Sequence, residues 1–410
     1  MAKPTIRFRG FDYEWEQRKF GEITELKSAS RVHKDEWTSN GVPFYRSSDV
    51  MAAINGTENE KAFISEELYE KLSKVSGKLE EGDILVTGGG SVGNPYIVPD
   101  NKPLYTKDAD LLWIKNKGKF HPYFLYEFFF SPTFRNYLES ISHVGTIAHY
   151  TITQLSDTPI CLPSFDEQKE VGEYFQSLDN LITLHQRKCD ETKKLKKYML
   201  QKMFPQNGSK VPEIRFKGFT DEWEQRKFGE IVEKYEDPIE TPTEGYTRLG
   251  IRSHAKGTFH SYVEKGKELE TAKMFRVAAD KFIVNITFGW EHAVAITDEN
   301  DAGKLVSHRF PQYSFNAGMN PNFFRYLILD ENFKHHLELS SPGGAGRNRV
   351  LKLSDMLEYK MNFPSEAEQK KIAAYFDDLD NLITLHQHKC EELKKLKKFM
   401  LQNMFTHKNK

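Results

Sequence analysis

The chain repeats itself, and this feature constrains its fold more than any other. Residues 4–23 and 212–231, the opening blocks, are identical at 16 of 20 positions. Residues 163–204 and 364–405, the closing blocks, are identical at 29 of 42 positions. Internal similarity of this length predicts two copies of one structural plan.

The segments between the blocks, here called the middles, have diverged. Residues 24–162 and 232–363 share only scattered positions, and the second middle is seven residues shorter. The opening and closing blocks together are here called the frame. Two units with different functions would keep the frame and change the middle. A recent duplication with a recombined middle would give the same pattern, so the repeat alone does not establish a function.

Each closing block has the pattern of a long helix. Apolar residues recur at spacings of three and four, as in the seam of a coiled coil. Ser164 with Glu167, and Ser365 with Glu368, have the spacing of capping boxes. Lys196 and Lys397 interrupt the apolar pattern near the helix ends. The predicted seam residues are Phe175, Leu178, Ile182, His185, Phe376, Leu379, Ile383 and His386.

Charge predicts how the two helices pair. Residues 166–179 hold five acids and one base, whereas residues 187–202 hold seven bases and two acids. An antiparallel pair sets the acidic start of each helix against the basic end of the other. We therefore predict an antiparallel coiled coil about 58 Å long at 1.5 Å per residue. The alternative for each helix alone is packing on a globular core, and the seam histidines are predicted to fix register rather than bind metal.

The middles combine strand and helix patterns. Residues 82–101 and 279–300 each predict two strands around a turn, and an aromatic-rich helix pair follows in both halves. The fold class is α+β: two mixed α/β domains joined by two long helices that pair as an antiparallel coiled coil, in a pseudo-two-fold repeat. The first domain is predicted at residues 1–162 and its long helix at 163–204, followed by a linker at 205–211. The second domain is predicted at residues 212–363, its long helix at 364–405 and a tail at 406–410.

Composition excludes several classes of protein. The net charge is −1, from 58 Lys+Arg and 59 Asp+Glu, so the chain is not a uniformly basic nucleic-acid coat. Cys161, Cys189 and Cys390 form no C-x-x-C pair, which favours a reducing cytoplasm. No apolar run reaches the roughly 18 residues that span a bilayer, and the first residues predict no secretory signal.

Motifs typical of enzymes are incomplete. Gly88, Gly90 and Gly93 fit G-x-G-x-x-G, but a turn and a strand follow them instead of the helix that a dinucleotide site needs. Asn94-Pro95-Tyr96 resembles the N-P-P-Y/F box of adenine methyltransferases but lacks the second proline. No H-E-x-x-H or nucleophile–base set is present. We therefore predict no catalytic residues and no metal site in this chain.

The candidates for DNA contact lie in loops of the middles. Arginine and asparagine read base edges, while lysine and glycine-rich backbone suit phosphates. For each residue alone the alternative is a solvated loop side chain. The first-domain candidates are Gly88, Gly89, Gly90, Ser91, His143, His149 and Tyr150; the second-domain candidates are Arg248, Arg252, His254, Lys256, Arg347, Asn348 and Arg349.

The ordered double occurrence of these blocks resembles the specificity (S) subunit of type I restriction-modification systems. The resemblance rests on W-E-Q-R-K-F-G-E-I at the start of each half, G-D-I-L-V-T-G-G-G-S-V-G in the first middle, and P-S-x-x-E-Q-K before each LDNLITLHQ helix. It covers nearly the whole chain.

The resemblance implies a division of labour. Each middle would be a target recognition domain for one half of a bipartite, asymmetric DNA site, and the paired helices would set the gap. Two modification (M) subunits would bring S-adenosylmethionine and adenine methylation. Where restriction (R) subunits are present, up to two of them would bring ATP/Mg-driven translocation and cleavage. This chain itself would bind no cofactor.

Other classes of function remain open on the sequence alone. A stand-alone two-domain DNA-binding regulator would bind DNA tightly without a partner. A bridging protein would bind no DNA, and a nuclease or methyltransferase would bind metal or S-adenosylmethionine as an isolated chain.

Overall fold

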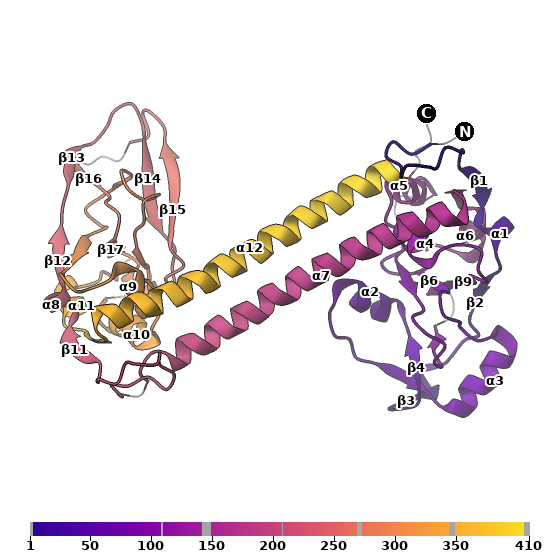
Figure 1. Ribbon diagram of the computed structural model, residues 1–410, viewed down its shortest axis with the longest axis horizontal. Coiled ribbons are helices and arrows are strands. Elements are labelled where there is room, and N and C mark those ends of the chain that lie inside the picture. Colours follow the sequence, from indigo (N-terminus) through magenta and orange to yellow (C-terminus); the bar gives the residue numbers. More distant parts are fainter. Residues whose placement is uncertain are drawn as a thin grey trace. The chain divides into compact units, whose positions relative to one another are not determined.

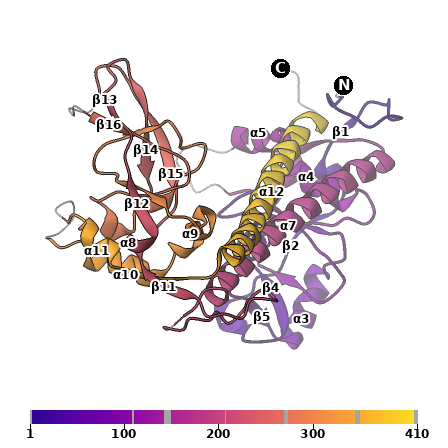
Figure 2. The ribbon, with the colours of Figure 1, turned by 60° about the vertical axis from the view of Figure 1, so that its left-hand side comes forward.

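A computed structural model of the chain describes residues 3–107, 110–141, 149–206, 208–268, 273–343 and 349–405. The chain divides into two compact units, which are described separately (Figures 1 and 2). Unit 1 contains residues 1–187 and 387–410, and unit 2 contains residues 188–386. Each unit therefore includes the start of one long helix and the end of the other.

Unit 1 holds the first middle and three sheets. One is the antiparallel pair β1 (Glu16–Lys19) and β10 (Pro159–Leu162). The second has the order β2 (Leu26–Ser28), β9 (Leu111–Ile114), β6 (Ile84–Thr87), β7 (Pro95–Ile97), and the third the order β3 (Trp37–Thr38), β5 (Ala62–Ile64), β4 (Val42–Tyr45), β8 (Tyr105–Thr106). The helices are α1 (Phe20–Ile23), η1 (Lys34–Glu36), α2 (Ser47–Asn55), α3 (Glu66–Ser76), α4 (Pro122–Phe128), α5 (Pro132–Ile141) and α6 (Ile152–Asp157).

Unit 2 holds the second middle on a similar frame. The antiparallel pair is β11 (Glu224–Lys227) with β21 (Lys360–Phe363). A four-stranded sheet has the order β12 (Val232–Tyr235), β20 (Gln312–Phe315), β17 (Lys281–Val284), β18 (Val294–Ile296), and a five-stranded sheet the order β13 (Pro238–Glu240), β16 (Lys273–Arg276), β19 (Leu305–Val306), β14 (Tyr246–Ile251), β15 (Thr258–Val263). The helices are α8 (Phe228–Ile231), η2 (Gly289–Glu291), α9 (Pro321–Leu327), α10 (Glu331–Leu339) and α11 (Leu353–Leu357).

The elements predicted in the middles are present. Strands β6 and β7 form an antiparallel hairpin around the glycine turn, and β17 pairs with β18 in the same way. The aromatic-rich segments form the helix pairs α4–α5 and α9–α10. The frame strands repeat as well, because Glu16 pairs with Leu162 and Glu224 with Phe363.

The long helices α7 (Phe165–Lys202) and α12 (Glu366–Met404) are antiparallel in each unit. In unit 1 the end of α12 lies on the start of α7, where Lys397 Nζ is 2.7 Å from the Asp179 carboxylate. In unit 2 the end of α7 lies on the start of α12, where Lys196 Nζ is 2.6 Å from the Asp380 carboxylate. The predicted antiparallel direction is thus confirmed, and the lysines that interrupt the apolar pattern make ion pairs across the seam.

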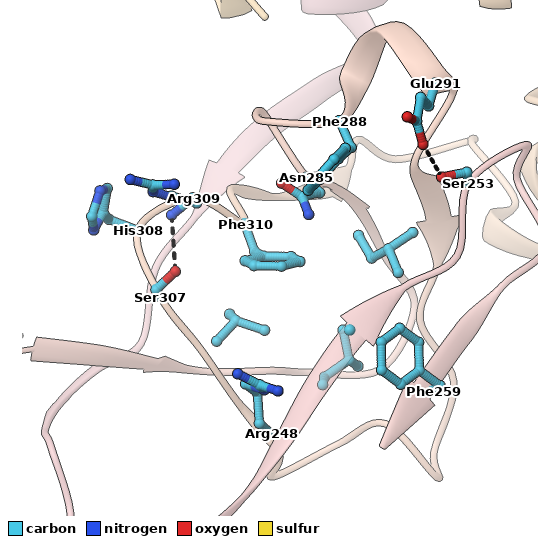
Figure 3. Close-up of a pocket in the computed structure, with 14 residues that line it drawn as sticks. Arg248, Ser253, Phe259, Asn285, Phe288, Glu291, Ser307, His308, Arg309 and Phe310 are labelled. Carbon is cyan, nitrogen blue, oxygen red and sulfur yellow. Dashed lines mark hydrogen bonds between the residues drawn. The ribbon is translucent and has the colours of Figure 1, made fainter. Parts of the chain in front are cut away.

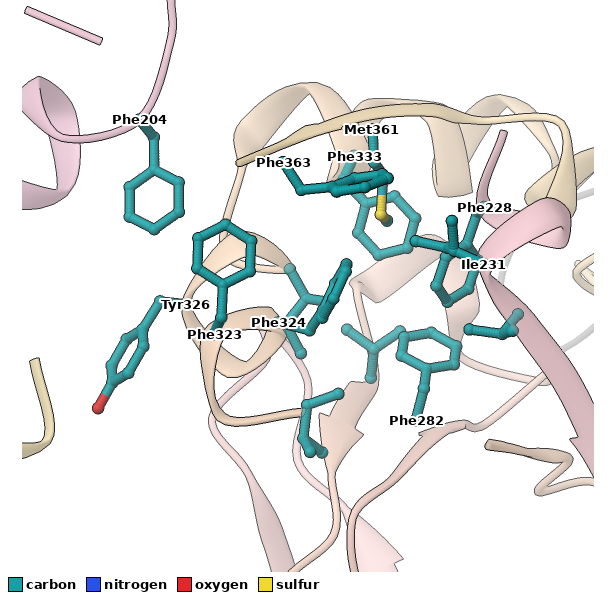
Figure 4. Packing of buried hydrophobic residues seen from close by; sticks show 14 of the residues in the cluster. Phe204, Phe228, Ile231, Phe282, Phe323, Phe324, Tyr326, Phe333, Met361 and Phe363 are labelled. Carbon is teal, nitrogen blue, oxygen red and sulfur yellow. The ribbon is translucent and has the colours of Figure 1, made fainter. Parts of the chain in front are cut away.

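Each unit completes its core with the end of a long helix. Met203 and Phe204 are buried in the aromatic core of unit 2. The rings of Phe204 and Phe323 stack there with centroids 5.6 Å apart (Figure 4). Met404 and Phe405, their counterparts in the second closing block, are buried in the core of unit 1. Burial of such side chains contributes about 1.5–3 kcal/mol each, so each unit depends on a helix that begins in the other half of the sequence.

The first predicted capping box is only partly formed, and in the second the Glu368 amide donates to the Ser365 carbonyl at 3.0 Å. The Glu167 amide donates to Ser164 Oγ, but the Glu167 carboxylate does not return to the backbone of Ser164. It instead accepts two hydrogen bonds from the Arg7 guanidinium, at 2.6 and 2.7 Å. Glu368 is held by Arg215 in the same way, at 2.7 and 2.8 Å. A buried carboxylate is better compensated by a charged, two-pronged donor than by one amide, and the sequence pattern could not indicate that competition.

Trp15 and Trp223 occupy matched positions in the opening blocks, and both are buried. Trp15 belongs to the core of unit 1 and Trp223 to the core of unit 2. Among the described residues no helix has the length and apolar character needed to cross a membrane.

Candidate nucleic-acid interface

The glycine-rich turn of unit 1 is an ordered loop between β6 and β7. The Gly93 amide donates to the Thr87 carbonyl (2.7 Å), and Asn94 Nδ2 donates to the Ser91 carbonyl (2.7 Å). Gly88 and Gly89 are buried, whereas Gly90 and Ser91 are exposed at the tip. Gly90 has a φ of 69°, which glycine adopts without strain. The loop therefore offers a short stretch of backbone to a ligand.

The chain returns to this loop at residues 149 and 150. The Tyr150 amide donates to the Gly88 carbonyl at 2.8 Å. His149 is exposed, and a Cβ on Gly89 would lie 3.8 Å from its Nδ1. The structure thus brings together the exposed candidates Gly90, Ser91 and His149.

Tyr150 needs a different assignment from the one that the sequence suggested. Its side chain is 1% exposed, and its hydroxyl hydrogen-bonds with Thr158 Oγ1. Burial also raises its pKa. A side chain packed in the core offers no surface to DNA, so Tyr150 supports the loop from beneath.

Arg135 of α5 supports the same loop, a role that no sequence motif predicted. Its guanidinium donates to Asn94 Oδ1 (3.0 Å) and to the Val92 carbonyl (3.3 Å), and it lies over the Phe130 and Phe134 rings. Desolvation lowers its pKa, although an arginine stays charged. No local motif signals this role, because α5 meets the loop only in the folded unit.

In unit 2 four of the seven second-domain candidates lie on the β14–β15 hairpin. Arg248 lies on β14, and Arg252, His254 and Lys256 lie in the turn; all four are exposed. The Arg252 guanidinium hydrogen-bonds to the Thr258 carbonyl, and its Cζ is 5.4 Å from the centre of the Phe259 ring.

The backbone of the turn is held against η2. The His254 amide donates to the Glu291 carbonyl and the Ala255 amide to the His292 carbonyl, both at 2.8 Å. His254 and Ala255 have φ values of 62° and 49°, a left-handed pair that non-glycine residues rarely adopt. The turn therefore presents Arg252, His254 and Lys256 from a fixed backbone.

A cavity of about 660 Å³ opens beside this hairpin; we call it the hollow (Figure 3). Arg248 lies at its edge, but the other basic residues there, His308 and Arg309, were not predicted. Both are exposed and lie between β19 and β20. The run Ser307-His308-Arg309-Phe310 was the available signal. The further lining residues are Leu249, Gly250, Ile251, Ser253, Phe259, Asn285, Phe288, Glu291, Val306, Ser307 and Phe310.

Arg349 lies apart from the hairpin residues and is partly buried. Its Nε donates to the Ser341 carbonyl (3.2 Å), and its Cζ is 5.3 Å from the Trp290 ring centre. This placement favours a structural role for Arg349 beside η2. His143, Arg347 and Asn348 lie outside the described residues.

The histidine beside the turn is structural. His292 is buried, and its Nε2–H donates to the Ile328 carbonyl at 2.8 Å. Desolvation lowers its pKa, so it stays neutral at physiological pH. Across the described residues, no group of three or more His, Cys, Asp or Glu side chains is arranged to hold a metal ion.

Burial of the predicted seam residues decreases with distance from the start of each long helix. Those nearest each helix start are buried: Phe175, Leu178, Phe376 and Leu379. The next four are half-buried: Ile182, His185, Ile383 and His386.

Comparison with known proteins agrees with this architecture. The model of the type I restriction modification DNA specificity domain matches the chain twice, at residues 13–194 and 220–395. The type I restriction enzyme MjaVIII specificity subunit of Methanocaldococcus jannaschii is 24% identical over 371 residues, which cover 84% of each chain. The putative MjaX specificity subunit of the same organism is 24% identical over 421 residues, covering 96% of this chain and 93% of that one.

A solved structure shares the fold. The type I restriction-modification S subunit from M. genitalium superposes with a TM-score of 0.58 and 13% identity, covering 99% of this chain and 100% of that one. The two family matches span well over half of the sequence and coincide with the two repeats. The chain therefore belongs to the type I restriction-modification DNA specificity family, as a specificity subunit with two specificity domains.

Proposed function

We propose that each middle reads one half of a bipartite, asymmetric DNA site and that the paired helices set the gap between the halves. One observation carries this proposal: two matches to one DNA specificity domain share a similar frame, identical at 16 of 20 and 29 of 42 positions, but have middles that share only scattered positions. If both middles read the same sequence, they would have no reason to differ while their frames stay alike.

The residues offered to DNA differ in kind between the units. Unit 1 offers the backbone tip at Gly90 and Ser91 together with His149. Unit 2 offers Arg248 and the turn residues from Arg252 to Lys256. Different side chains at the two interfaces support two different half-sites, because arginine, histidine and backbone amides meet different groups on DNA.

Two DNA-reading domains on one chain can discriminate between DNA sequences better than one domain can. A mismatched base pair costs about 1–3 kcal/mol, so one small domain separates few sequences. Two domains on one chain combine their discrimination, and linkage keeps the second domain at high effective concentration. The near-zero net charge fits this arrangement if partner subunits supply much of the phosphate contact.

We assign catalysis to the partners: two M subunits with S-adenosylmethionine, and R subunits with ATP and magnesium. A complex that acts on chromosomal DNA in this way works in the cytoplasm. The stand-alone regulator is not favoured, because the family match is to a restriction-modification specificity domain.

Exposed apolar residues on the long helices support docking of two M subunits. Unit 1 exposes an apolar set formed by Leu181, Leu396 and Phe399. Unit 2 exposes the set at equivalent repeat positions, Leu382, Leu195 and Tyr198. These six side chains are 40–51% exposed. Equivalent apolar sets in both units suit two copies of one partner.

Co-expression with the cognate M subunit, followed by genome-wide mapping of N6-methyladenine, tests the proposal. The expected result is one bipartite motif with two unlike halves and a fixed gap, which disappears when this chain is omitted. A continuous motif, or methylation that does not depend on the chain, would overturn the proposal.

A further inference from the structure

The hollow in unit 2 has an apolar floor and a basic rim. Its floor includes Leu249, Ile251 and Val306, which are all buried. The rings of Phe259, Phe288 and Phe310 line it, and Arg248, His308 and Arg309 stand at its edge (Figure 3). Its volume of about 660 Å³ lies in the range typical of small-molecule sites.

A protruding loop can reach base edges in a groove, whereas a concave site suits a nucleotide that has left the duplex. Base edges in a duplex lie inside the grooves, where helices, strands and loops reach them. For duplex DNA to fill a cavity, one of its nucleotides must leave the helix. Proteins that take in an extruded nucleotide stack its base between aromatic or apolar side chains and bind the edge of the base by hydrogen bonds.

Asn285 supplies such a hydrogen-bonding group. Its Oδ1 accepts from the Thr287 amide at 3.1 Å, which fixes the orientation of the side chain. Figure 3 shows the amide nitrogen of Asn285 turned toward the middle of the hollow, above Phe310. A fixed N–H donor over an aromatic ring suits a ring-nitrogen or carbonyl acceptor on a stacked base.

Phe259 keeps its place in the wall because residue 250 is glycine. A Cβ on Gly250 would lie 2.3 Å from the Phe259 ring, so the ring packs directly on the β14 backbone. Arg252 covers the ring, with Cζ 5.4 Å from its centre. The wall thus joins the hollow to the basic turn at residues 252–256.

We propose that the hollow receives one nucleotide extruded from duplex DNA, with its base on the apolar floor and its phosphate near Arg248 and Arg309. This inference rests on the proposed function and deepens it, because it names the part of DNA that unit 2 takes in. A free mononucleotide has the same chemistry, so the experiment compares both sources.

The test uses the complex of this chain with its M subunits and duplexes that carry the mapped motif. The fluorescent base 2-aminopurine replaces each base of the half-site read by unit 2, one position at a time. Its emission rises when it leaves the stack. We expect a several-fold rise at one position besides the methylated adenine, which the M subunit extrudes for its own reaction.

The variants connect that signal to the hollow. Asn285→Ala, at saturating protein and with binding checked by fluorescence anisotropy, is expected to lower the extra emission several-fold and to leave the emission at the methylated adenine unchanged. Gly250→Ala, which displaces Phe259, is a second variant with the same expected effect. Arg276→Ala is the control, because Arg276 is an exposed arginine of β16 that does not line the hollow.

The outcomes separate the two proposals. Loss of all specific binding and methylation by the wild-type complex would count against the proposed function. Specific methylation with no extra bright position, or an extra position indifferent to both variants, would overturn the extruded nucleotide alone. Thermal stabilisation of the wild-type chain by free AMP, lost in Asn285→Ala and without any bright position in DNA, would also overturn extrusion and assign the hollow to a free nucleotide.

Discussion

At the scale of single residues, Glu127 is an ionisable group buried in unit 1. Its side chain is fully buried, and its Oε1 is 2.8 Å from Lys397 Nζ, which also binds Asp179 at 2.7 Å. Its other carboxylate oxygen is buried without a hydrogen-bond partner. Burial raises the pKa of Glu127 to about 8, so Glu127 is mostly protonated near neutral pH.

This pKa makes the stability of unit 1 depend on pH. Below pH 4.5, the ordinary pKa of a glutamate side chain, Glu127 is mostly protonated in both the folded and the unfolded chain. Between pH 4.5 and about 8 only the unfolded chain releases the proton, so the free energy of unfolding falls by up to about 1.4 kcal/mol per pH unit. Above that range both states are ionised and the effect levels off.

Glu127→Gln should remove this dependence, because the amide cannot ionise. We expect the melting temperature of the wild type to fall relative to that of the variant between pH 5 and pH 8, as measured by scanning calorimetry. Glu139→Gln, a change at an exposed glutamate, is the control. If the melting temperatures of the wild type and of Glu127→Gln changed in parallel between pH 5 and pH 8, Glu127 would be ionised in the folded chain. That result would contradict the raised pKa.

Residue-level roles were only partly predictable from sequence. Lys196 and Lys397 were visible as breaks in the apolar pattern, but their aspartate partners depend on the register between the two helices. Tyr150 was assigned to DNA because of its neighbours, and its burial follows from packing that no local motif encodes. His308, Arg309 and Asn285 join Arg248 only through the folding of β14, β17 and the segment after β19.

At the scale of elements, the long helices were the most predictable part of the chain. Their apolar spacing and charge asymmetry indicated both their extent and their antiparallel direction. The strands of the middles were predictable as local hairpins, whereas their order within the sheets was not, because sheet order depends on contacts between distant segments.

We expect the length of α7 and α12 to control the gap between the two DNA half-sites. Insertion of one heptad after residue 187 and another after residue 387 keeps the seam in phase. It adds about 10 Å at 1.5 Å per residue, or roughly three base pairs at 3.4 Å each. We expect methylation mapping to show both half-sites unchanged and a gap longer by about three base pairs. Altered half-sites with the original gap would refute this role of the helices.

The exposed apolar sets predict where M subunits bind. Leu396→Ser combined with Phe399→Ser changes the set of unit 1 and leaves the set of unit 2 intact. The complex should then hold one M subunit instead of two, which native mass spectrometry measures directly. The matched control, Lys398→Ser, changes an exposed residue between them and should retain two. Two bound M subunits in the double variant would exclude this docking surface.

At the scale of the whole molecule, each unit requires a helix end from the other half of the sequence. Ile6 donates its amide to the Asn403 carbonyl, and Ile214 donates to the Lys202 carbonyl, at 3.0 and 2.9 Å. A half-chain of residues 1–211 lacks Met404 and Phe405 but carries their counterparts, Met203 and Phe204.

Two copies of this half-chain can therefore supply each other's missing helix end. We expect residues 1–211 to form a homodimer, with twice the monomer mass by light scattering. Phe204→Asp in the half-chain should abolish the dimer, because it places a charge in the core that Phe204 would complete. A folded, stable monomer of residues 1–211 would contradict the shared-core arrangement.

If the middles read DNA and the frame only holds them, a chain that carries the first middle twice should read one half-site twice. Residues 24–162 replace residues 232–363, so that both frames carry the first middle, and N6-methyladenine is mapped after co-expression with the M subunit. The account predicts that the half-site read by the first middle now occurs at both ends of the methylated motif. Retention of the original second half-site, or a change at both ends of the motif, would contradict it.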